Sequence, residues 1–172
     1  MGSMAEGNSN NQGNLGGQQA TDGGPQIKAR VLAQYIKDLS FENPNVHRLF
    51  ENPGSSPNLQ IEVNVNVAKV KDKVFESAIA FKAEATNDAG VVYDLELAYA
   101  GLFEIDSMPE QMVEPFLMVN CPTLIFPYLR RLVQDLTREG GFPPLVLDPI
   151  DFGSIYVNRQ RERAAHGAVK WS

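Results

Sequence analysis

A strict alternation of apolar and polar residues in the middle of the chain constrains the fold most. In "NLQIEVNVNVAKV" every second residue from Leu59 to Val67 is apolar, and the residues between them are polar or charged. Successive side chains of a β-strand point to opposite sides, so this pattern is typical of a strand with one buried and one solvated face. The chain is therefore expected to contain a sheet whose two faces differ in polarity.

Two further strands are predicted to follow through short turns. The "KDK" turn at 71–73 precedes "VFESAIAFKAEA", in which Phe75, Ile79 and Phe81 share one face, and "NDAG" at 87–90 then supplies turn residues. In the third strand, "VVYDLELAYAGLFEI", the side chains expected to point inward are those of Val91, Tyr93, Leu95, Leu97, Tyr99 and Phe103. Those expected on the other face are Val92, Asp94, Glu96 and Ala98. Consecutive hairpins predict an antiparallel meander with one apolar and one acidic face.

The segment at 27–45, "IKARVLAQYIKDLSFENPN", fits two patterns. Helical spacing is met by Val31, Leu32, Tyr35, Ile36 and Leu39. Strand alternation is met by Ile27, Ala29, Val31, Ala33 and Tyr35. Periodicity alone does not choose between a helix and a strand. The prolines, glycine and serines at 44–57 predict a long irregular connection to the meander.

Helices are predicted after the meander. The segment 108–119, "MPEQMVEPFLMV", has a favourable first turn, but Pro115 limits it to a short or kinked helix. The next helix has Pro122 near its start and ends at Gly140 and Gly141. Its wide apolar stripe has helical spacing and comprises Leu124, Ile125, Tyr128, Leu129, Leu132, Val133 and Leu136. An extended proline-rich loop and a last short helix from Asp151 are expected to complete the fold.

Composition predicts one domain between two polar ends. Residues 1–24 contain seven glycines, four asparagines and three glutamines, and we expect this head to be disordered. The first three residues resemble a cloning scar before a natural start at Met4. The folded domain is predicted over 25–158, and 159–172 as a basic helix end and tail. The sequence has no signal-peptide pattern and no long uninterrupted apolar run, which predicts a soluble protein that is not inserted in a membrane.

Acidic residues dominate the domain. The net charge is −6 overall, and residues 25–158 carry 18 acidic and 11 basic side chains, a net charge of −7. Between Phe75 and Phe116 nine acidic residues accompany one basic residue, Lys82. Such a surface repels phosphate backbones, which argues against a nucleic-acid partner and favours basic proteins or peptides. A solubilising sheet face is the alternative interpretation.

Nothing in the sequence predicts an active site. Cys121 is the only cysteine, and a cysteine nucleophile needs a base such as His47 or His166, neither of which is near it in sequence. One cysteine and two histidines do not form a recognisable zinc pattern, and no glycine loop of the phosphate-binding type is present. We therefore predict no catalytic residue, no metal and no cofactor, and a structural role for Cys121 at the start of a helix.

Four segments together resemble the SecB family of bacterial protein-export chaperones. They are "YIKDLSFENPN" at 35–45, "YAGLFEI" at 99–105, "CPTLIFPYLRRLV" at 121–133 and "GGFPPLVLDPIDF" at 140–152. The match covers nearly all of residues 26–158. The resemblance implies an α+β subunit, a four-stranded antiparallel sheet with helices packed on one side, that assembles as a tetramer (a dimer of dimers). It also implies that 27–41 is the first strand and 44–57 a crossover connection.

The resemblance further implies a function without catalysis. Such a protein would hold unfolded precursor polypeptides in the cytoplasm without ATP and deliver them to the translocase motor SecA. By the match of positions, the motor-binding carboxylates would be Asp38, Glu42, Asp94 and Glu96. The client-binding residues would be Phe41, Phe50, Leu124, Phe126 and Tyr128, each of which could equally belong to the core or to a subunit interface. A SecB-like chaperone dedicated to one partner, such as an antitoxin, is the alternative.

One segment departs from the family pattern. Some members have a tryptophan in the crossover connection, where this chain has "PGSSP" at 53–57. The aromatic lining of a client groove on that side is therefore not predicted by the resemblance.

Overall fold

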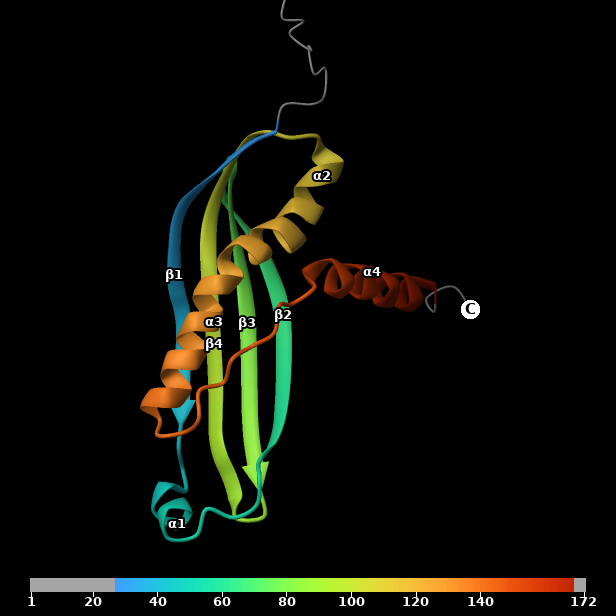
Figure 1. Ribbon diagram of the computed structural model, residues 1–172. Helices are drawn as coiled ribbons and strands as arrows, with labels where there is room; N and C mark the ends of the chain where they lie inside the picture. Colours follow the sequence, from blue (N-terminus) through green and yellow to red (C-terminus); the bar gives the residue numbers. More distant parts are fainter. Residues whose placement is uncertain (1–26, 169–172) are drawn as a thin grey trace, which may run out of the picture.

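Four long antiparallel strands form the centre of the protein in the computed structural model, which describes residues 27–168. The strands are β1 (Lys28–Glu42), β2 (Asn58–Lys71), β3 (Val74–Asn87) and β4 (Gly90–Ser107). Their order across the sheet is β1-β4-β3-β2 (Figure 1). The predicted meander of β2, β3 and β4 is confirmed. The connection from β1 to β2, which contains the short helix α1 (Val46–Glu51), passes from one edge of the sheet to the other at one end (Figure 1).

Both predicted hairpin turns are present. β2 and β3 are joined at Asp72 and Lys73, and Lys73 has a positive φ of 59°. β3 and β4 are joined at Asp88 and Ala89, directly before Gly90, whose φ of 115° suits a residue without a Cβ. Two-residue turns of this kind fix the register of the strands that they join.

The first strand explains why its sequence pattern was ambiguous. β1 pairs with β4, and after a first register shift at Lys28 the register shifts between Val31 and Ala33 and again between Ile36 and Asp38. Each of the last two shifts adds one residue to β1, so the residues that face the helices change parity every five residues. By their β4 partners, these inward residues are Ala29, Val31, Gln34, Ile36, Leu39 and Phe41. The inward residues of a strand with two bulges therefore recur at a spacing that resembles the repeat of a helix.

A bulge in β4, where it pairs with β3, overturns the expectation for Val92. Ala85 lies opposite Tyr93 and Thr86 lies opposite Val91, which makes Val92 an additional residue in β4. Its side chain is only 6% exposed, although alternation predicted an outward position. Beyond the bulge the prediction is confirmed, since Tyr93 and Leu95 are buried.

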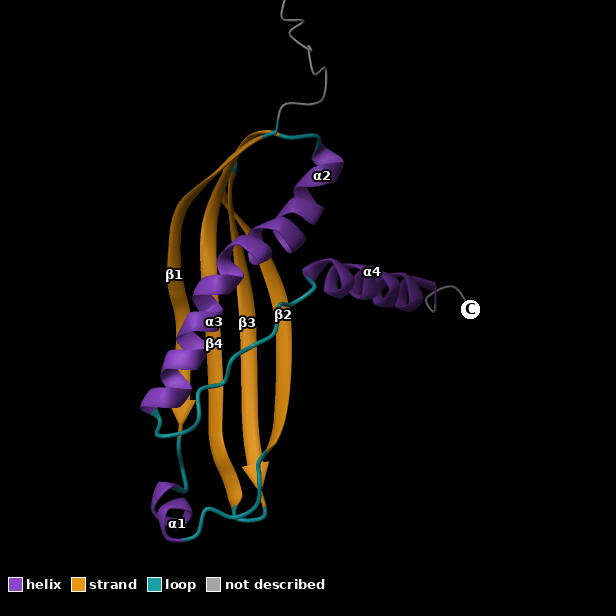
Figure 2. Ribbon diagram, in the orientation of Figure 1, coloured by secondary structure: helices purple, strands orange, loops and turns teal. Residues whose placement is uncertain are grey.

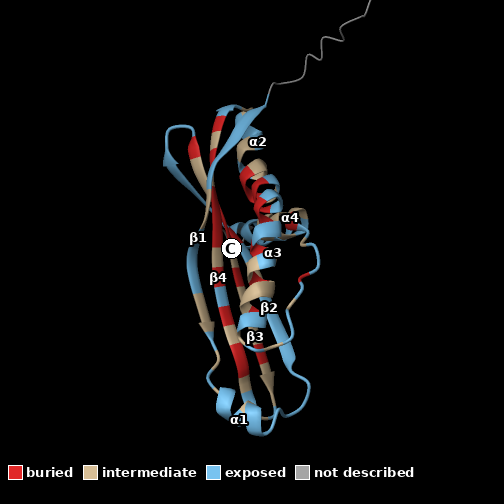
Figure 3. Ribbon diagram, turned by 60° about the vertical axis from the view of Figure 1, so that its left-hand side comes forward, coloured by how far each residue is buried: buried red, intermediate tan, exposed pale blue. Residues whose placement is uncertain are grey.

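One continuous helical segment covers one face of the sheet. It consists of α2 (Glu110–Pro115), a π-helical turn η1 (Phe116–Asn120) and α3 (Cys121–Glu139) (Figures 1 and 2). The buried side of α3 contains Ile125, Leu129 and Val133, each with no exposed surface. Buried residues concentrate on β3, β4 and this side of α3 (Figure 3). The predicted α+β fold with helices on one side is therefore confirmed.

The helix lies close to β4 at Gly101. A Cβ added to Gly101 would lie 2.7 Å from the Phe103 ring and 3.3 Å from Cγ2 of Ile125. Contacts that short require neighbouring atoms to move, so the absence of a side chain at Gly101 allows the helix to rest on the sheet.

The π-helical turn is attached to the sheet by a buried hydrogen bond. The N–H of Cys121 donates to the carbonyl of Phe116, five residues earlier, which leaves the Leu117 carbonyl without its α-helical donor. The residue five positions after Leu117 is Pro122, which has no N–H. Instead, the hydroxyl of Ser77 on β3 donates to the Leu117 carbonyl at 2.7 Å, and Ser77 has no exposed surface. The bond therefore satisfies a carbonyl that Pro122 and the π-turn would leave unpaired in the core.

The chain returns across the helix-covered face and leads into α4 (Phe152–Ala168) (Figure 1). Phe152 is buried against Phe126, with ring centroids 6.0 Å apart. Further along α4, Arg159 donates to the Val65 carbonyl of β2 at 2.7 Å, and Arg163 lies 3.3 Å from Glu114. The last helix is therefore longer than the predicted short one and continues ten residues beyond position 158. The predicted disordered head at 1–24 lies outside the described residues.

The helical segment also carries apolar surface that the subunit itself does not cover. From Glu110 to Glu139 it is long and apolar enough to cross a membrane by length and composition alone, and 39% of its most apolar window is buried inside the fold. The buried side chains contact the sheet, as the core helix of a globular subunit does. Leu124 and Tyr128 on its other side are about half exposed.

Replacement of Ser77 by alanine tests the attachment of the π-turn. We expect Ser77→Ala to lower the free energy of unfolding by about 1–3 kcal/mol, because the buried Leu117 carbonyl loses its donor. Ser40→Ala, the same change at a partly exposed position of β1, should stay within about 0.5 kcal/mol. Denaturant unfolding of both variants measures the difference. Equal stability of the two variants would contradict a structural role for the Ser77 bond.

Candidate functional site

The face of the sheet opposite the helices carries a group of carboxylates, here called the acidic face. Its members are Asp38, Glu42, Glu62, Glu84, Asp94 and Glu96. Across three adjacent strands, Glu42, Asp94 and Glu84 lie directly opposite one another, and Asp38 lies opposite Ala98, two residues beyond Glu96. The sheet thus brings the four predicted motor-binding residues together from β1 and β4, with two further carboxylates on β2 and β3 that the prediction did not include.

One lysine lies among these carboxylates. Lys82 Nζ is 3.4 Å from Oε1 of Glu96 and 4.0 Å from Oδ2 of Asp94. Its hydrogen bond to Glu96, with the charge of Asp94, raises the pKa of Lys82 above its usual value. The other oxygen of Asp94, Oδ1, is buried and has no hydrogen-bond partner within the described part of the chain. A shallow depression of about 180 Å³ is lined by Lys82, Glu96, Asp38 and Glu62, together with Asn64, Ala80, Phe81, Leu97 and Ala98.

A second polar cluster occupies the same face, toward the end of the sheet where β2 turns into β3. Lys37 and the Tyr35 hydroxyl both donate to the carboxylate of Glu76. These two bonds lower the pKa of Glu76, the bond from Lys37 having the larger effect. Partial burial, followed by the bond to Glu76, raises the pKa of Tyr35 to about 12. Because the carboxylate of Glu76 is already bonded to Lys37 and Tyr35, this cluster leaves less unpaired negative charge for a partner than the acidic face does.

An apolar groove lies at the end of the sheet where α1 crosses. Its volume is about 700 Å³. It lies between the crossover connection and the loop after α3, and its lining residues are Asn43, Val46, Leu49, Phe50, Pro53, Gly54, Ser55, Ser56, Pro57, Asn87, Val92, Gly140, Gly141, Phe142 and Pro143. Phe50 is 89% exposed. An exposed aromatic beside an apolar hollow is typical of a surface that binds another chain.

Aromatic stacking supports one wall of this groove. Phe142 lines the groove and packs on Tyr93 with ring centroids 5.1 Å apart, and Tyr93 stacks on Phe41 at 5.8 Å. Phe41 also lies against Gly140, where an added Cβ would be 2.4 Å from the ring. The three rings therefore join β1, β4 and the loop after α3 into a rigid wall.

The other wall is built from the segment that departs from the family pattern. Asp88, in the turn between β3 and β4, accepts hydrogen bonds from the backbone N–H and the hydroxyl of Ser55, at 2.7 and 2.8 Å. These bonds lower the pKa of Asp88. The side-chain amide of Asn87 donates to the carbonyls of Pro53 and Ser55. The crossover connection is thus fixed to the turn by hydrogen bonds.

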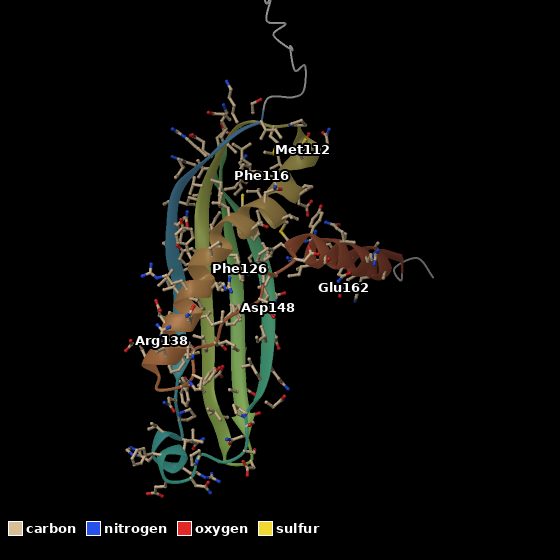
Figure 4. All side chains as sticks on the ribbon, in the orientation of Figure 1. Met112, Phe116, Phe126, Arg138, Asp148 and Glu162 are labelled. Carbon is tan, nitrogen blue, oxygen red and sulfur yellow. The ribbon has the colours of Figure 1, made fainter. Side chains whose placement is uncertain are left out.

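The five predicted client-binding residues have different environments. Phe50 lines the groove, and Phe41 lies behind its wall. Leu124 and Tyr128 are exposed on α3 outside the groove. Phe126, labelled on α3 in Figure 4, is buried against Phe152 and is not available to a client in this subunit. The groove is also lined by Val46, Leu49 and Phe142, which the prediction did not include. For the first two, their helical spacing with Phe50 was a usable signal.

Cys121 has the environment of a core residue. Its side chain is 1% exposed, and burial raises the pKa of its thiol to about 12. Within residues 27–168 neither His47 nor His166 is hydrogen-bonded to it, and both histidines are exposed. Among the same residues, no group of three or more histidine, cysteine or carboxylate side chains is arranged to hold a metal ion. What the described residues do present is charge on the acidic face and exposed apolar surface at the groove.

Comparison with known proteins gives consistent matches. The chain matches the family model for SecB, the preprotein translocase subunit, over residues 22–163. A protein-export protein SecB of Parvibaculum lavamentivorans is 43% identical over 164 residues, which cover 95% of each chain. One from Methylocella silvestris is 44% identical over 145 residues, which cover 84% of this chain and 89% of the relative.

A solved structure is also similar. It is the SecB-like chaperone of Mycobacterium tuberculosis in complex with a peptide from an antitoxin, with a TM-score of 0.57, 20% identity, and coverage of 71% of this chain and 90% of that one. At that level of identity the similarity supports the fold alone.

The environment of Cys121 leads to a prediction about reactivity. The native thiol should not react with a disulfide reagent at pH 8.5, whereas the denatured protein should react with one equivalent, because only the thiolate attacks. The sign is set by burial: the folded state keeps the proton up to about pH 12, while the unfolded thiol loses it near its ordinary value of about 8.5. A time course of thiol release with and without denaturant measures this. Rapid reaction of the native protein would contradict a buried structural role for Cys121.

Proposed function

Because this chain belongs to the SecB family of preprotein translocase subunits, we propose that it holds unfolded precursor proteins without ATP and delivers them to the translocase motor SecA. The apolar groove beside Phe50 is the observation that carries the holding function. We place this activity in the cytosol, where precursors are available before export, and propose no catalytic role for the chain.

Client binding in this proposal depends on apolar contact. An unfolded chain exposes apolar side chains and unpaired backbone, and a groove of this size accepts such segments without reading a sequence. Phe50 supplies a large exposed ring at the rim, and Phe142 supplies a fixed ring in the wall. A groove with one exposed and one fixed aromatic ring suits clients of many sequences.

Assembly into a dimer of dimers would cover the apolar surface that a single subunit leaves exposed. Val31, Ile36 and Leu39 lie on the helix-side face of the edge strand β1 and remain about 40% exposed. Leu124 and Tyr128 add exposed apolar surface on α3. Exposed apolar surface of this extent favours burial between subunits. We therefore assign Leu124 and Tyr128 to the subunit interface in preference to the client groove.

Motor docking in this proposal uses the acidic face. Asp38, Glu42, Asp94 and Glu96 would contact a basic segment of the motor, through charges that accelerate encounter and that salt weakens. Since the acidic face and the helices lie on opposite sides of the sheet, a client on the helix side would leave the docking carboxylates accessible.

A chaperone dedicated to a single partner is the alternative. The structural neighbour from Mycobacterium tuberculosis is bound to an antitoxin peptide, but its 20% identity carries the fold alone. The relatives at 43–44% identity are protein-export proteins, which favours export. Binding to a panel of unrelated unfolded proteins separates the two functions, because a dedicated chaperone would retain only one of them.

Light scattering with an unfolded polypeptide that refolds slowly tests the holding function. We expect a tetramer that forms a soluble complex with the unfolded chain and ignores its folded form. Phe50→Ser should weaken this complex roughly tenfold, the loss typical of removing an aromatic anchor. Val70→Ser, which removes an exposed apolar side chain outside the groove, should bind like the native protein. A monomer that is indifferent to both forms of the polypeptide would refute the proposal.

Charge reversal tests the docking function separately. Asp94→Lys with Glu96→Lys should weaken binding to the motor roughly tenfold or more, because two attractive charges become repulsive. Client holding should be unchanged. Glu139→Lys with Asp148→Lys changes the net charge equally, at two exposed positions away from the acidic face, and serves as the control. Loss of motor and client binding together in the Asp94 and Glu96 variant, measured by titration, would contradict the separation of the two surfaces.

A further inference from the structure

Lys82 lies where a basic partner would have to bind. It is the one basic residue between Phe75 and Phe116, and the strand register places it directly opposite Glu62 on one side and Glu96 on the other. Its ammonium group contacts both Glu96 and Asp94, two of the four carboxylates assigned to the motor. An ammonium group of the chain itself therefore already occupies the acidic face.

The ion pairs of Lys82 are weak because the side chains that form them are exposed to solvent. The side chains of Lys82 and Glu96 are 40% and 54% exposed, and ion pairs of that exposure contribute little to folding. The lysine is held by two carboxylates at once, but each contact is long enough, at 3.4 and 4.0 Å, to be exchanged for a contact with an incoming cation. Asp94 is left with a second oxygen that no donor in the described part of the chain reaches. The carboxylate of Asp94 therefore has only part of its hydrogen-bonding capacity filled, and an incoming cation can displace Lys82 from it.

We propose that Lys82 is a built-in competitor that a basic partner must displace from Glu96 and Asp94 before it can dock on the acidic face. This inference rests on the proposed docking function and adds an affinity-determining residue to it. Lys82 competes with every cationic segment for the same carboxylates and lowers the affinity of each. A segment with one positive charge then binds weakly, whereas a segment with several charges still binds and is selected. Lys82 therefore sets how many positive charges a partner needs in order to bind the acidic face.

Binding of hexalysine, a defined cationic probe, tests this competition. Lys82→Gln removes the charge and keeps most of the side-chain length. We expect it to bind hexalysine roughly threefold tighter than the native protein at low ionic strength, with the gain shrinking as salt is added. Calorimetric or fluorescence titration at two salt concentrations gives the ratio.

Lys73→Gln is the matched control. It makes the same change in net charge and also leaves a carboxylate without its lysine, since Lys73 lies 3.7 Å from Asp106. Lys73 is nine residues from Lys82 along the chain, about 30 Å along a strand. General electrostatic attraction would strengthen binding in both variants equally, whereas local competition strengthens it in Lys82→Gln alone.

A double mutant locates the effect. The increase in hexalysine affinity caused by Lys82→Gln should be smaller in a protein that also carries Glu96→Gln. In that protein the carboxylate that removal of Lys82 would free is already absent. Unchanged or weaker binding of hexalysine by Lys82→Gln, including no measurable binding by either protein, would overturn the inference. Failure of the docking function has a different signature: the motor itself would bind equally to the native protein and to the Asp94→Lys, Glu96→Lys variant.

Discussion

The hydrogen bond from Ser77 to the Leu117 carbonyl and the bare backbone of Gly101 fix the helical segment on the sheet. A helical segment that contains a π-turn and three prolines has carbonyls without donors, and burying such a carbonyl costs free energy unless the sheet supplies a partner. Ser77 and Gly101 lie directly opposite each other on β3 and β4, so one small residue donates a hydrogen bond and the next allows close approach. The helix is thereby placed over the two central strands.

This placement determines which surfaces remain for binding. The centre of one sheet face is filled by Ile125, Leu129 and Val133, which leaves apolar side chains of the edge strand β1 and the outward side of α3 exposed. At the end of the sheet beyond α3 the space is closed by the crossover connection instead, and the apolar groove forms there. Within residues 27–168 no helix covers the opposite face, which carries the carboxylates of the acidic face. The candidate binding surfaces are thus the parts of the sheet that one short helical layer does not reach.

The sequence predicted the elements that obey a simple period. The meander, both hairpin turns and the outward position of Asp94 and Glu96 follow from alternation, because nothing disturbs the pairing of β3 with β4 over those residues. Periodicity alone did not identify β1, since two bulges shift its parity, and it misplaced Val92 for the same reason. The groove was only partly predictable: Phe50 was named from the family resemblance, but Phe142 meets Tyr93 and Phe41 through contacts between segments far apart in the chain. Phe126 could not be separated from a groove residue without knowing that Phe152 covers it.

The bulge at Val92 allows two unlike surfaces to lie close together on one strand. Without the additional residue, Val92 and Asp94 would point to the same face, and an apolar side chain would lie among the carboxylates. With it, Val92 lines the groove on the helix side while Asp94, two residues away, lies on the acidic face. Contacts in the groove are apolar and depend little on ionic strength, whereas contacts on the acidic face weaken as salt is added. A bound client and a docked basic partner would therefore respond to different conditions, although a single strand carries both of their sites.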